Sequence, residues 1–417
     1  MPASASLSIA AVGDRVGGLE TPDPVLLAPT LHEVLGGLVD PRKQRGVRHG
    51  LVVVLTVVVC AVLAGARSFV AIAEWVADVP DDLAAALGTD RRCPSESTIR
   101  RVLGKVDADR LDAVLGGFVQ RLSTAAMPTG SDMGGRRRVL AVDGKTLRGS
   151  RHTDRAGTEV PGRHLLAVID QHSRVVLGQL AVDVTADGKA QGKASEINQF
   201  IPLLDTLTGI DLRGVVITAD ALHTQREHVQ DLHARGAHWV LTVKGNQPRL
   251  RRQLAALPWR DVEPGHRSAE TSHGRRQIRV LKVVTIAAGI AFPHARQAIQ
   301  IVRRSRPVNA RTGKKGRWHT ETVYAITDLA PHQARPAELA AWIRGHWQIE
   351  NGLHWVRDVT FAEDLSQIRV GAGPQVMATL RNLAISLHRL AGATNIAKAL
   401  RHHSRNALRP LHLLKIT

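Results

Sequence analysis

The sequence predicts an α/β protein in which an all-helical N-terminal domain precedes a mixed β-sheet. The first observation is a helical pattern of apolar residues that extends from Leu31 to Leu122. The second is a group of three β-rich runs that begins at Val139, with intervening loops short enough for antiparallel pairing. The third is an alternation of helix and strand patterns between Ser195 and Lys244, which adds further strands to the same sheet.

The N-terminal part divides into two regions. Residues 1–29 are rich in Ala, Pro, Gly and Ser without periodicity, so we expect a mobile leader. Residues 30–128 form the predicted helical domain. Its most apolar helix, Leu51–Ala66, has sixteen residues, fewer than the ~20 needed to span a bilayer, so it is predicted to be a buried core helix and not a membrane segment. Near residues 95–103, capping serines precede two arginines, which suits a DNA-contacting module, although an ordinary helical bundle fits equally well.

The remainder of the chain is predicted to contain a basic linker, the sheet and a tail. Residues 129–138 are a linker rich in Gly, Ser and Arg, and residues 139–391 contain the mixed sheet. Short β runs indicate a β-rich insertion at about 248–333. The segment 392–417 is predicted to be a basic tail, because the 53 residues after Asp364 contain eight Lys or Arg and no acid.

The charge balance predicts a polyanionic partner. The formal net charge is +19, from 56 Lys and Arg against 37 Asp and Glu. Nucleic acid is the commonest such partner, although ribosome or membrane-surface binding would give the same balance. Cys60 and Cys93 are too few for a disulfide framework or a Cys-based zinc module. With no signal peptide visible, a cytoplasmic location is predicted.

Two aspartates follow apolar β runs. Asp143 follows Val139–Val142, and Asp220 follows Val215–Ala219. One such acid is ordinary turn chemistry, but two at the ends of neighbouring strands would form a two-carboxylate site where ligands gather in α/β sheets. Gly144 would let a ligand approach the backbone closely.

The stretch Ile343–Asp364 supplies a third acid. His346, Glu350 and His354 are spaced at i, i+4 and i+8, which places them on one face of a helix. The adjacent stripe contains Trp347 and Trp355 and is expected to pack the helix against the domain. A solvated helix and a zinc site at His346, Glu350 and His354 are the alternatives, but neither an open coordination position nor a second shell is evident for zinc.

Two aspartates and a glutamate on a helix match the needs of a pair of magnesium ions. Hard cations take oxygen ligands, and two of them about 3.5–4 Å apart can hold the attacking and leaving oxygens of a phosphodiester. The predicted metal ligands and catalytic residues are therefore Asp143, Asp220 and Glu350, with Mg²⁺ as the cofactor and Mn²⁺ as a substitute.

Several blocks of sequence, in the same order, resemble the DDE transposases of bacterial insertion sequences. The blocks are VLAVDGKTLRGS, TADALHTQ, WVLTVKGNQP, HWQIENGLHWVRDVTFAEDLSQIR and MATLRNLAISLHRL. Within that family the chain is most similar to the H-repeat-associated proteins of Rhs elements, over roughly residues 31–391. The resemblance implies a ribonuclease-H-like core with a β-strand insertion between the second Asp and the Glu. It assigns the three acids to Asp143, Asp220 and Glu350.

The resemblance also implies a function. A transposase of this kind binds the ends of its own element as double-stranded DNA, cleaves them, and transfers the freed 3′-hydroxyl to target DNA. Such enzymes commonly work as homo-oligomers on paired ends. A bacterial, nucleoid-associated location follows from that substrate. A two-metal nuclease that only hydrolyses DNA, and a non-catalytic DNA-binding descendant, are the alternative functions.

The sequence departs from the family around the glutamate. Related transposases carry Tyr, Arg, Glu and Lys at i, i+3, i+7 and i+14, where this chain has Ile343, His346, Glu350 and Arg357. Arg357 would still provide a cation for DNA phosphate, with Arg344 or His346 as a substitute for the missing arginine. Basic residues predicted to contact DNA, near the acids or in the β-rich insertion, are Lys145, Arg148, Lys244, Arg303, Arg304, Lys314, Lys315, Arg317, His346 and Arg357.

Overall fold

The computed structural model describes residues 30–416, apart from positions 46, 90–91, 127–136, 183–195, 273 and 310. The predicted leader and all but two residues of the predicted linker lie outside the described residues.

One mixed nine-stranded sheet forms the centre of the protein, which confirms the predicted mixed α/β class. In spatial order its strands are β5 (Val176–Ala181), β4 (His164–Asp170), β1 (Val139–Thr146), β6 (Val216–Ala219), β7 (His238–Val243), β11 (His319–Thr327), β10 (Gln297–Pro307), β9 (Arg275–Thr285) and β8 (His266–Ser272).

The sheet contains both kinds of pairing that the sequence predicts. β1, β4 and β5 form the antiparallel meander, in which each strand pairs with the next along the chain. β6 then pairs with β1 in parallel, and β7 pairs with β6 in parallel. A crossover connection is needed between parallel strands, and α9 (Arg226–Ala234) lies in the connection from β6 to β7. These five strands are strongly buried, as strands covered on both faces must be.

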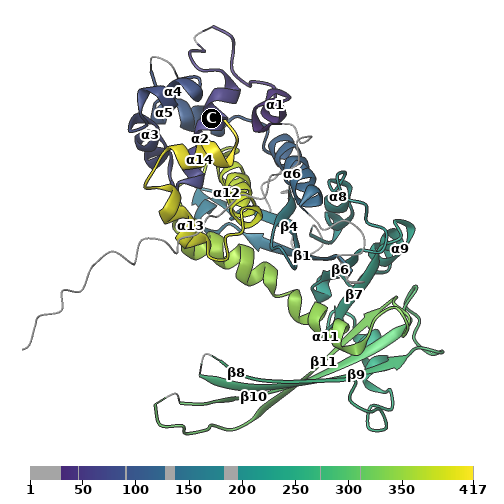
Figure 1. The fold of residues 1–417 in the computed structure, drawn as a ribbon. Helices are drawn as coiled ribbons and strands as arrows, with labels where there is room; N and C mark the ends of the chain where they lie inside the picture. The colour runs from purple at the N-terminus through teal and green to yellow at the C-terminus, as the bar shows by residue number, and fades with distance from the viewer. Residues whose placement is uncertain are drawn as a thin grey trace, which may run out of the picture.

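Helices cover the meander half of the sheet, as Figure 1 shows. The other described helices are α1 (Leu31–Gly36), α2 (Leu51–Leu63), α3 (Phe69–Ala77), α4 (Asp81–Ala86), α5 (Glu96–Leu103), α6 (Ala108–Ala125), α8 (Phe200–Asp205), α10 (Pro248–Ala255), α11 (Pro336–Gly345), α12 (Gly373–Leu390), α13 (Ile396–His403) and α14 (Leu408–Leu413).

The N-terminal helices share a core with the sheet and with the C-terminal helices. A single cluster of buried apolar side chains extends from Leu31 to Leu414 and includes residues of β1, β4 and β5. Gln120 on α6 ties these parts together, because its Nε2 donates to the Leu177 carbonyl (2.8 Å) and to the Thr206 carbonyl (3.0 Å). α2 is buried along nearly its whole length, as predicted, and no described helix is long and apolar enough to cross a membrane.

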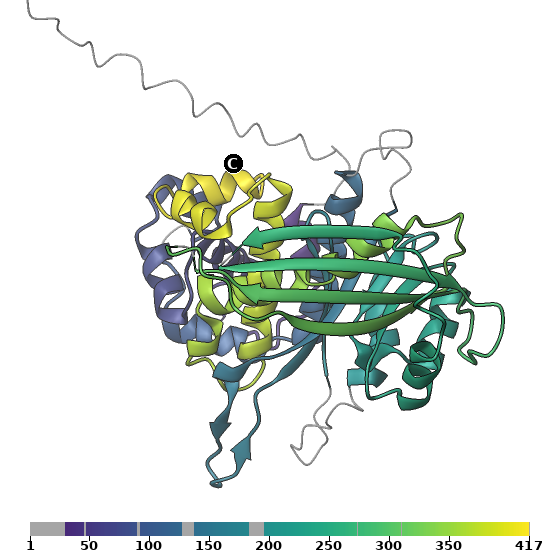
Figure 2. The same cartoon turned by 90° about the horizontal axis from the view of Figure 1, so that it is seen from below.

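The predicted β-rich insertion extends the same sheet. β11 pairs antiparallel with β7, with Tyr324 opposite Val243, and β10, β9 and β8 follow in antiparallel order. Figure 2 shows these four long strands lying side by side as one curved arm. The strand β8, HRSAETS, is polar throughout, so its sequence gave no alternation of apolar and polar residues to indicate a strand.

The segment after α11 is not the regular helix that its spacing predicted. Glu350–His354 and Val356–Thr360 have π-helical hydrogen bonding, from residue i to i+5. The face that this segment buries is not the predicted one, since Ile349 and Leu353 are fully buried while Trp347 and Trp355 are 60% and 55% exposed. The expectation that the two tryptophans pack the helix against the domain is therefore wrong.

A buried charge network anchors this irregular segment. Arg357 donates from Nε to both carboxylate oxygens of Glu363, at 2.9 and 3.0 Å. Arg381 of α12 donates from Nη1 to the same carboxylate at 2.8 Å. Arg357 also donates to Gln179 of β5, at 3.2 Å. All three charged side chains are at most 2% exposed, so the network holds the segment against α12 and β5.

Replacing Glu363 with alanine is expected to destabilise the fold strongly. The change leaves two buried arginines without their carboxylate, and breaking a buried ion pair in this way costs about 3–5 kcal/mol. Denaturant unfolding of Glu363→Ala measures the loss. The control is Asp211→Ala, which breaks the exposed pair with Arg213 and should leave the unfolding free energy nearly unchanged. A Glu363→Ala protein as stable as that control would contradict the anchoring role.

Candidate active site

The two aspartates singled out in the sequence follow neighbouring parallel strands. β1 and β6 run in register, with Val142 opposite Ala219. Asp143 is the next residue of β1, and Asp220 directly follows β6. Both acids therefore lie at the same edge of the sheet, where side chains at the carboxyl ends of strands face a common space.

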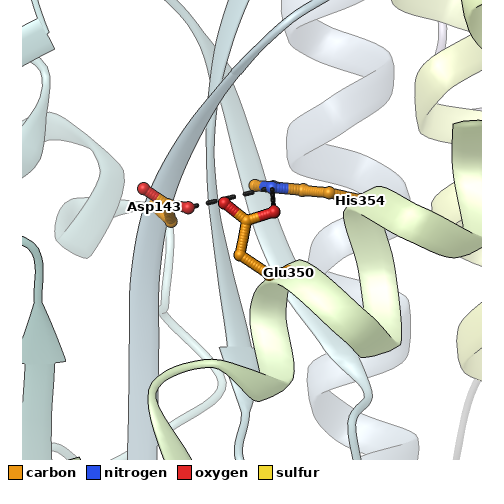
Figure 3. A group of neighbouring side chains, drawn as sticks. All are labelled: Asp143, Glu350 and His354. Atoms are coloured by element: carbon orange, nitrogen blue, oxygen red, sulfur yellow. Dashed lines mark ion pairs between the residues drawn. The ribbon is translucent and has the colours of Figure 1, made fainter. Parts of the chain in front are cut away.

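Glu350 and His354 from the first π-helical turn meet Asp143. One ligand atom from each of these three side chains lies within 4.8 Å of the others. The Nδ1 atom of His354 is 3.4 Å from Glu350 Oε2 and 3.8 Å from Asp143 Oδ2, as drawn in Figure 3. His354 is almost fully buried, whereas the Glu350 side chain is 59% exposed. The exposed glutamate thus lies between the half-buried Asp143 and the protein surface.

The electrostatics of this cluster favour a bound cation. Burial, followed by the charge of Glu350, raises the pKa of Asp143 to about 7. The charges of Glu196 and Asp220 raise it further. The hydrogen bond with His354 lowers the pKa of Glu350, so this second acid keeps its negative charge. Carboxylates crowded in this way repel one another unless a positive charge lies between them.

Asp220 stands slightly apart from the cluster. Its charge acts on Asp143, but its oxygens are not part of the 4.8 Å group among the described residues. Its Oδ1 atom accepts a hydrogen bond from Lys244 Nζ at 2.8 Å. Burial raises the pKa of Asp220, but the Lys244 hydrogen bond opposes it and the net change is a lowering. A cationic side chain therefore neutralises Asp220.

The donor set fits a hard divalent cation better than zinc. Asp143 and Glu350 offer carboxylate oxygens, which suit Mg²⁺ and Mn²⁺, and His354 adds a single imidazole nitrogen. His346, the other histidine of the zinc alternative, points elsewhere, with its Nδ1 atom 3.3 Å from Thr218 Oγ1. The three residues of the proposed zinc site do not meet in the described structure.

Comparison with known protein families decides the identity. A model of the transposase DDE domain matches residues 134–387, and a model of the domain associated with it matches residues 32–119. The chain belongs to the DDE transposase family. It is thus a DDE-type DNA transposase, a class that implies dependence on a divalent metal.

Curated relatives match most of this transposase. YncI of Escherichia coli O157:H7, which carries a transposase name, is 27% identical over 366 residues, covering 86% of this chain and 87% of its own. YhhI of E. coli K12, named as H repeat-associated, is 26% identical and covers 86% and 89%. A solved piggyBac transposase synaptic complex with hairpin DNA overlaps 92% of this chain and 78% of its own, at 9% identity and a TM-score of 0.39. That overlap is too weak to show a common fold.

The basic residues predicted near the transposase site are engaged with acids. Lys145 Nζ lies 2.7 Å from Asp358 Oδ1, and its side chain is only 10% exposed. Arg148 is well exposed, 3.8 Å from Asp364. Lys244 pairs with Asp220 as described. Burial lowers the pKa of His346 to about 4, so this histidine is neutral at physiological pH.

The prediction that Arg357 contacts DNA is wrong. The side chain is fully buried and its guanidinium is held by Glu363, so it cannot reach a phosphate. The position that carries a cation in related transposases is used here to anchor the π-helical segment.

The predicted cations of the insertion lie on β10 and in the loop that joins it to β11. Arg303 pairs with Glu321 across β10 and β11. Arg304 and Arg306 cover the Trp318 ring, with guanidinium carbons 5.0 and 4.5 Å from its centroid. The remaining predicted residues, all exposed, are Lys314, Lys315 and Arg317.

Sequence reasoning missed one acid close to the site, Glu196. Its charge contributes to the raised pKa of Asp143, although it lies far from Asp143 in the chain. No strand end or helical spacing distinguishes it in the sequence, so only the tertiary structure reveals its position.

Changing Asp143 to Asn is expected to have opposite effects with and without metal. In the metal-free protein the change removes a crowded, buried negative charge and should raise the melting temperature. With Mn²⁺ at about 100 times its Kd, wild-type protein should gain about 2.7 kcal/mol, and the variant should gain far less. Thermal unfolding with and without Mn²⁺ measures both effects. Asp211→Asn, an exposed acid remote from the cluster, should behave like wild type; equal Mn²⁺ stabilisation of Asp143→Asn would rule out this metal site.

Proposed function

We propose that this transposase cleaves DNA at the ends of its own element and joins the freed 3′ ends to target DNA. Asp143, Asp220 and Glu350 would hold the metal, with Mg²⁺ as the natural ion and Mn²⁺ as a substitute. The observation that carries the proposal is the convergence of acids at one sheet edge, where Glu350 approaches Asp143 closely enough to raise its pKa. The transposase names of the relatives support the same reaction.

A bound metal would activate the attacking hydroxyl group, and residues of the chain would hold the metal in position. When bound, a pair of magnesium ions lowers the pKa of water or of a 3′-hydroxyl and offsets charge on the leaving oxygen. Asp143 is held by a central strand paired on both sides, so its position is rigid. Glu350 is exposed enough to face DNA, while His354 Nδ1 orients its carboxylate from the buried side. No covalent bond between protein and DNA is required.

Lys145 and Lys244 would guide the DNA backbone into the site. Lys145 lies close enough for its charge to act on Glu350 and His354. Lys244 touches Asp220. Both amines are therefore within the region where a scissile phosphate would bind, with Arg148 and His346 nearby as further contacts.

The core is proposed to be ribonuclease-H-like. The order of three antiparallel strands followed by two parallel strands with intervening helices supports this assignment. The arm of β8 to β11 occupies the place of the β-strand insertion between the second aspartate and the glutamate.

Double-stranded DNA, as element ends and as target, is the proposed partner. The net charge of +19 and the exposed basic residues of the arm support this partner. We further propose that the protein works as a homo-oligomer on paired ends, in the bacterial cytoplasm at the nucleoid, where that DNA is found.

Asp143→Asn and Glu350→Gln are expected to abolish cleavage of DNA carrying the element ends while leaving end binding intact. Each change keeps the side-chain shape but removes a charge that the metal requires. A gel assay of cleavage in Mg²⁺, with binding measured in Ca²⁺, tests this expectation, and Asp211→Asn serves as the charge-matched control. Cleavage by Asp143→Asn at the wild-type rate would overturn the assignment.

The same proteins distinguish transposition from simple hydrolysis. Pre-cleaved ends with a free 3′-hydroxyl should be joined to target DNA by wild-type protein. If ends are cut but never joined, the protein is a two-metal nuclease; if neither occurs in Mg²⁺, it is a DNA-binding protein without catalysis.

The arm is expected to contribute sequence-independent DNA affinity. Replacing Lys314, Lys315 and Arg317 together with alanine should reduce the slope of log K against log salt by up to about 2.7, because each phosphate contact contributes about 0.9. Fluorescence anisotropy at several salt concentrations measures the slope. Arg213→Ala, which removes an exposed arginine already paired with Asp211, is the control. An unchanged slope in the triple variant would show that the arm does not bind phosphate.

A further inference from the structure

Glu196 joins two histidines beside the acidic cluster. It lies shortly before α8, and its carboxylate accepts hydrogen bonds on both oxygens. His164 Nε2 is 2.8 Å from Oε2, and His223 Nε2 is 3.1 Å from Oε1. We call these three residues the His–Glu–His clamp. Although burial raises the pKa of Glu196, the two histidines lower it to about 2, so the Glu196 carboxylate is ionised.

The clamp connects the two segments that carry the aspartates. His164 is the first residue of β4, and it lies opposite Thr146 in the pairing of β4 with β1. Its other ring nitrogen, Nδ1, is 2.9 Å from Thr146 Oγ1. His223 ends the short 3-10 turn Ala221–His223, which begins directly after Asp220. Glu196 therefore bridges the end of β1 to the turn that fixes Asp220.

Gly144 provides the space that the clamp needs. A Cβ atom at this position would lie 2.6 Å from His164 Nε2 and 2.8 Å from the Glu196 carboxylate, closer than real Cβ contacts. The glycine beside Asp143 was expected to admit a ligand. In the structure, the side chains of Glu196 and His164 occupy this space, so the clamp lies directly against the backbone next to Asp143.

The clamp is held rigidly from the side of Asp220. His223 is fully buried, and its ring lies 5.0 Å from the Phe200 ring and 5.6 Å from the His228 ring. His228 in turn stacks on Phe200, with ring centroids 4.2 Å apart. The Nδ1 atom of His228 lies 3.1 Å from the carbonyl oxygen of His223, within hydrogen-bonding distance. His223 is therefore held in place by its neighbours, and its hydrogen bond in turn fixes the position of Glu196.

We propose that the His–Glu–His clamp is a positioning device that fixes the distance between Asp143 and Asp220 for metal binding. Glu196 acts through Gly144 on one aspartate and through His223 on the other. The inference rests on the proposed function, because it assumes that these two aspartates hold the metal. Partners that orient ligands in this way typically change metal affinity or activity about 10–100-fold when they are removed.

Glu196→Ala is expected to weaken Mn²⁺ binding to the DNA-free protein by about 10–100-fold. The amount of free Mn²⁺, measured by electron paramagnetic resonance in a titration of the full chain, gives this affinity. The rate of strand joining at saturating DNA should fall as well, while the KM for DNA should stay close to that of wild type. Glu196→Gln keeps the size of the side chain and one accepting oxygen, so a smaller loss is expected.

Asp328→Asn is the matched control for a purely structural effect. Asp328 accepts a hydrogen bond from His238 Nδ1 at 2.7 Å, which makes a second His–carboxylate pair of similar burial. His238 lies at the start of β7, at the opposite end of the strand from Lys244. Asp328→Asn should lower thermal stability but leave Mn²⁺ affinity unchanged.

A double-mutant cycle tests the contact through Gly144. Gly144→Ala should weaken Mn²⁺ binding in the wild-type background, because the new methyl group displaces the clamp. In the Glu196→Ala background the same change should cost much less, since the carboxylate is gone and His164 has lost one of its restraining bonds. Additive effects would overturn the link between Gly144 and Glu196.

The outcomes separate this inference from the proposed function. If Asp143→Asn binds Mn²⁺ as tightly as wild type, the proposed metal site fails. If Asp143→Asn loses binding but folded Glu196→Ala and Glu196→Gln bind like wild type, only the clamp fails. If Glu196→Ala does not fold, Glu196→Gln decides the question in the same Mn²⁺ titration, and Mn²⁺ binding equal to wild type would overturn the clamp.

Discussion

The parallel register between β1 and β6 is the constraint on which the candidate site depends. It brings Val142 opposite Ala219, so the next residue of each segment, Asp143 and Asp220, reaches the same sheet edge. A shift of one residue would turn Asp143 to the other face of the sheet, because side chains alternate along a strand. The buried strands on either side prevent such a shift, since β4 and β6 hold β1 from both edges. The register thus brings the two acids to the same end of the sheet, where the proposed clamp sets their final separation.

The third acid arrives by a different kind of constraint. Glu350 belongs to an irregular helix whose π-helical turns would be unstable without tertiary contacts. Those contacts come from Arg357 and its buried pairing with Glu363, seven and thirteen residues after Glu350. The buried ion pair of Arg357 with Glu363 therefore holds the exposed carboxylate of Glu350 in place. Arg357, at the position where related transposases carry a cation near the glutamate, thus stabilises the fold in this chain.

The sequence was sufficient to predict most strands of the sheet other than β8 and to single out the three acids, but not to predict what surrounds them. The meander, the alternating α/β order and the apolar runs that precede Asp143 and Asp220 are visible as local patterns of apolar residues, which the chain alone displays. The exposure of Trp347 and Trp355 was mispredicted because the spacing groups side chains on one face of the helix but does not show which face is buried. The burial of Arg357 and the position of Glu196 depend on partners distant in sequence, such as Arg381 and His164. The periodicity of apolar residues in the sequence does not reveal contacts between residues that are distant along the chain.

The last strand of the arm has a consequence for how molecules of this protein meet. Among the described strands, β8 has no neighbour on its outer side, and an unpaired edge of this kind is a template for adding a strand from another molecule. Its sequence, HRSAETS, is short and hydrophilic, and Glu270 within it is paired with Arg279 and Arg344. These are the features by which natural sheets resist edge-to-edge aggregation. The polar sequence of β8, which prevented its prediction as a strand, thus also protects the exposed arm from edge-to-edge self-association.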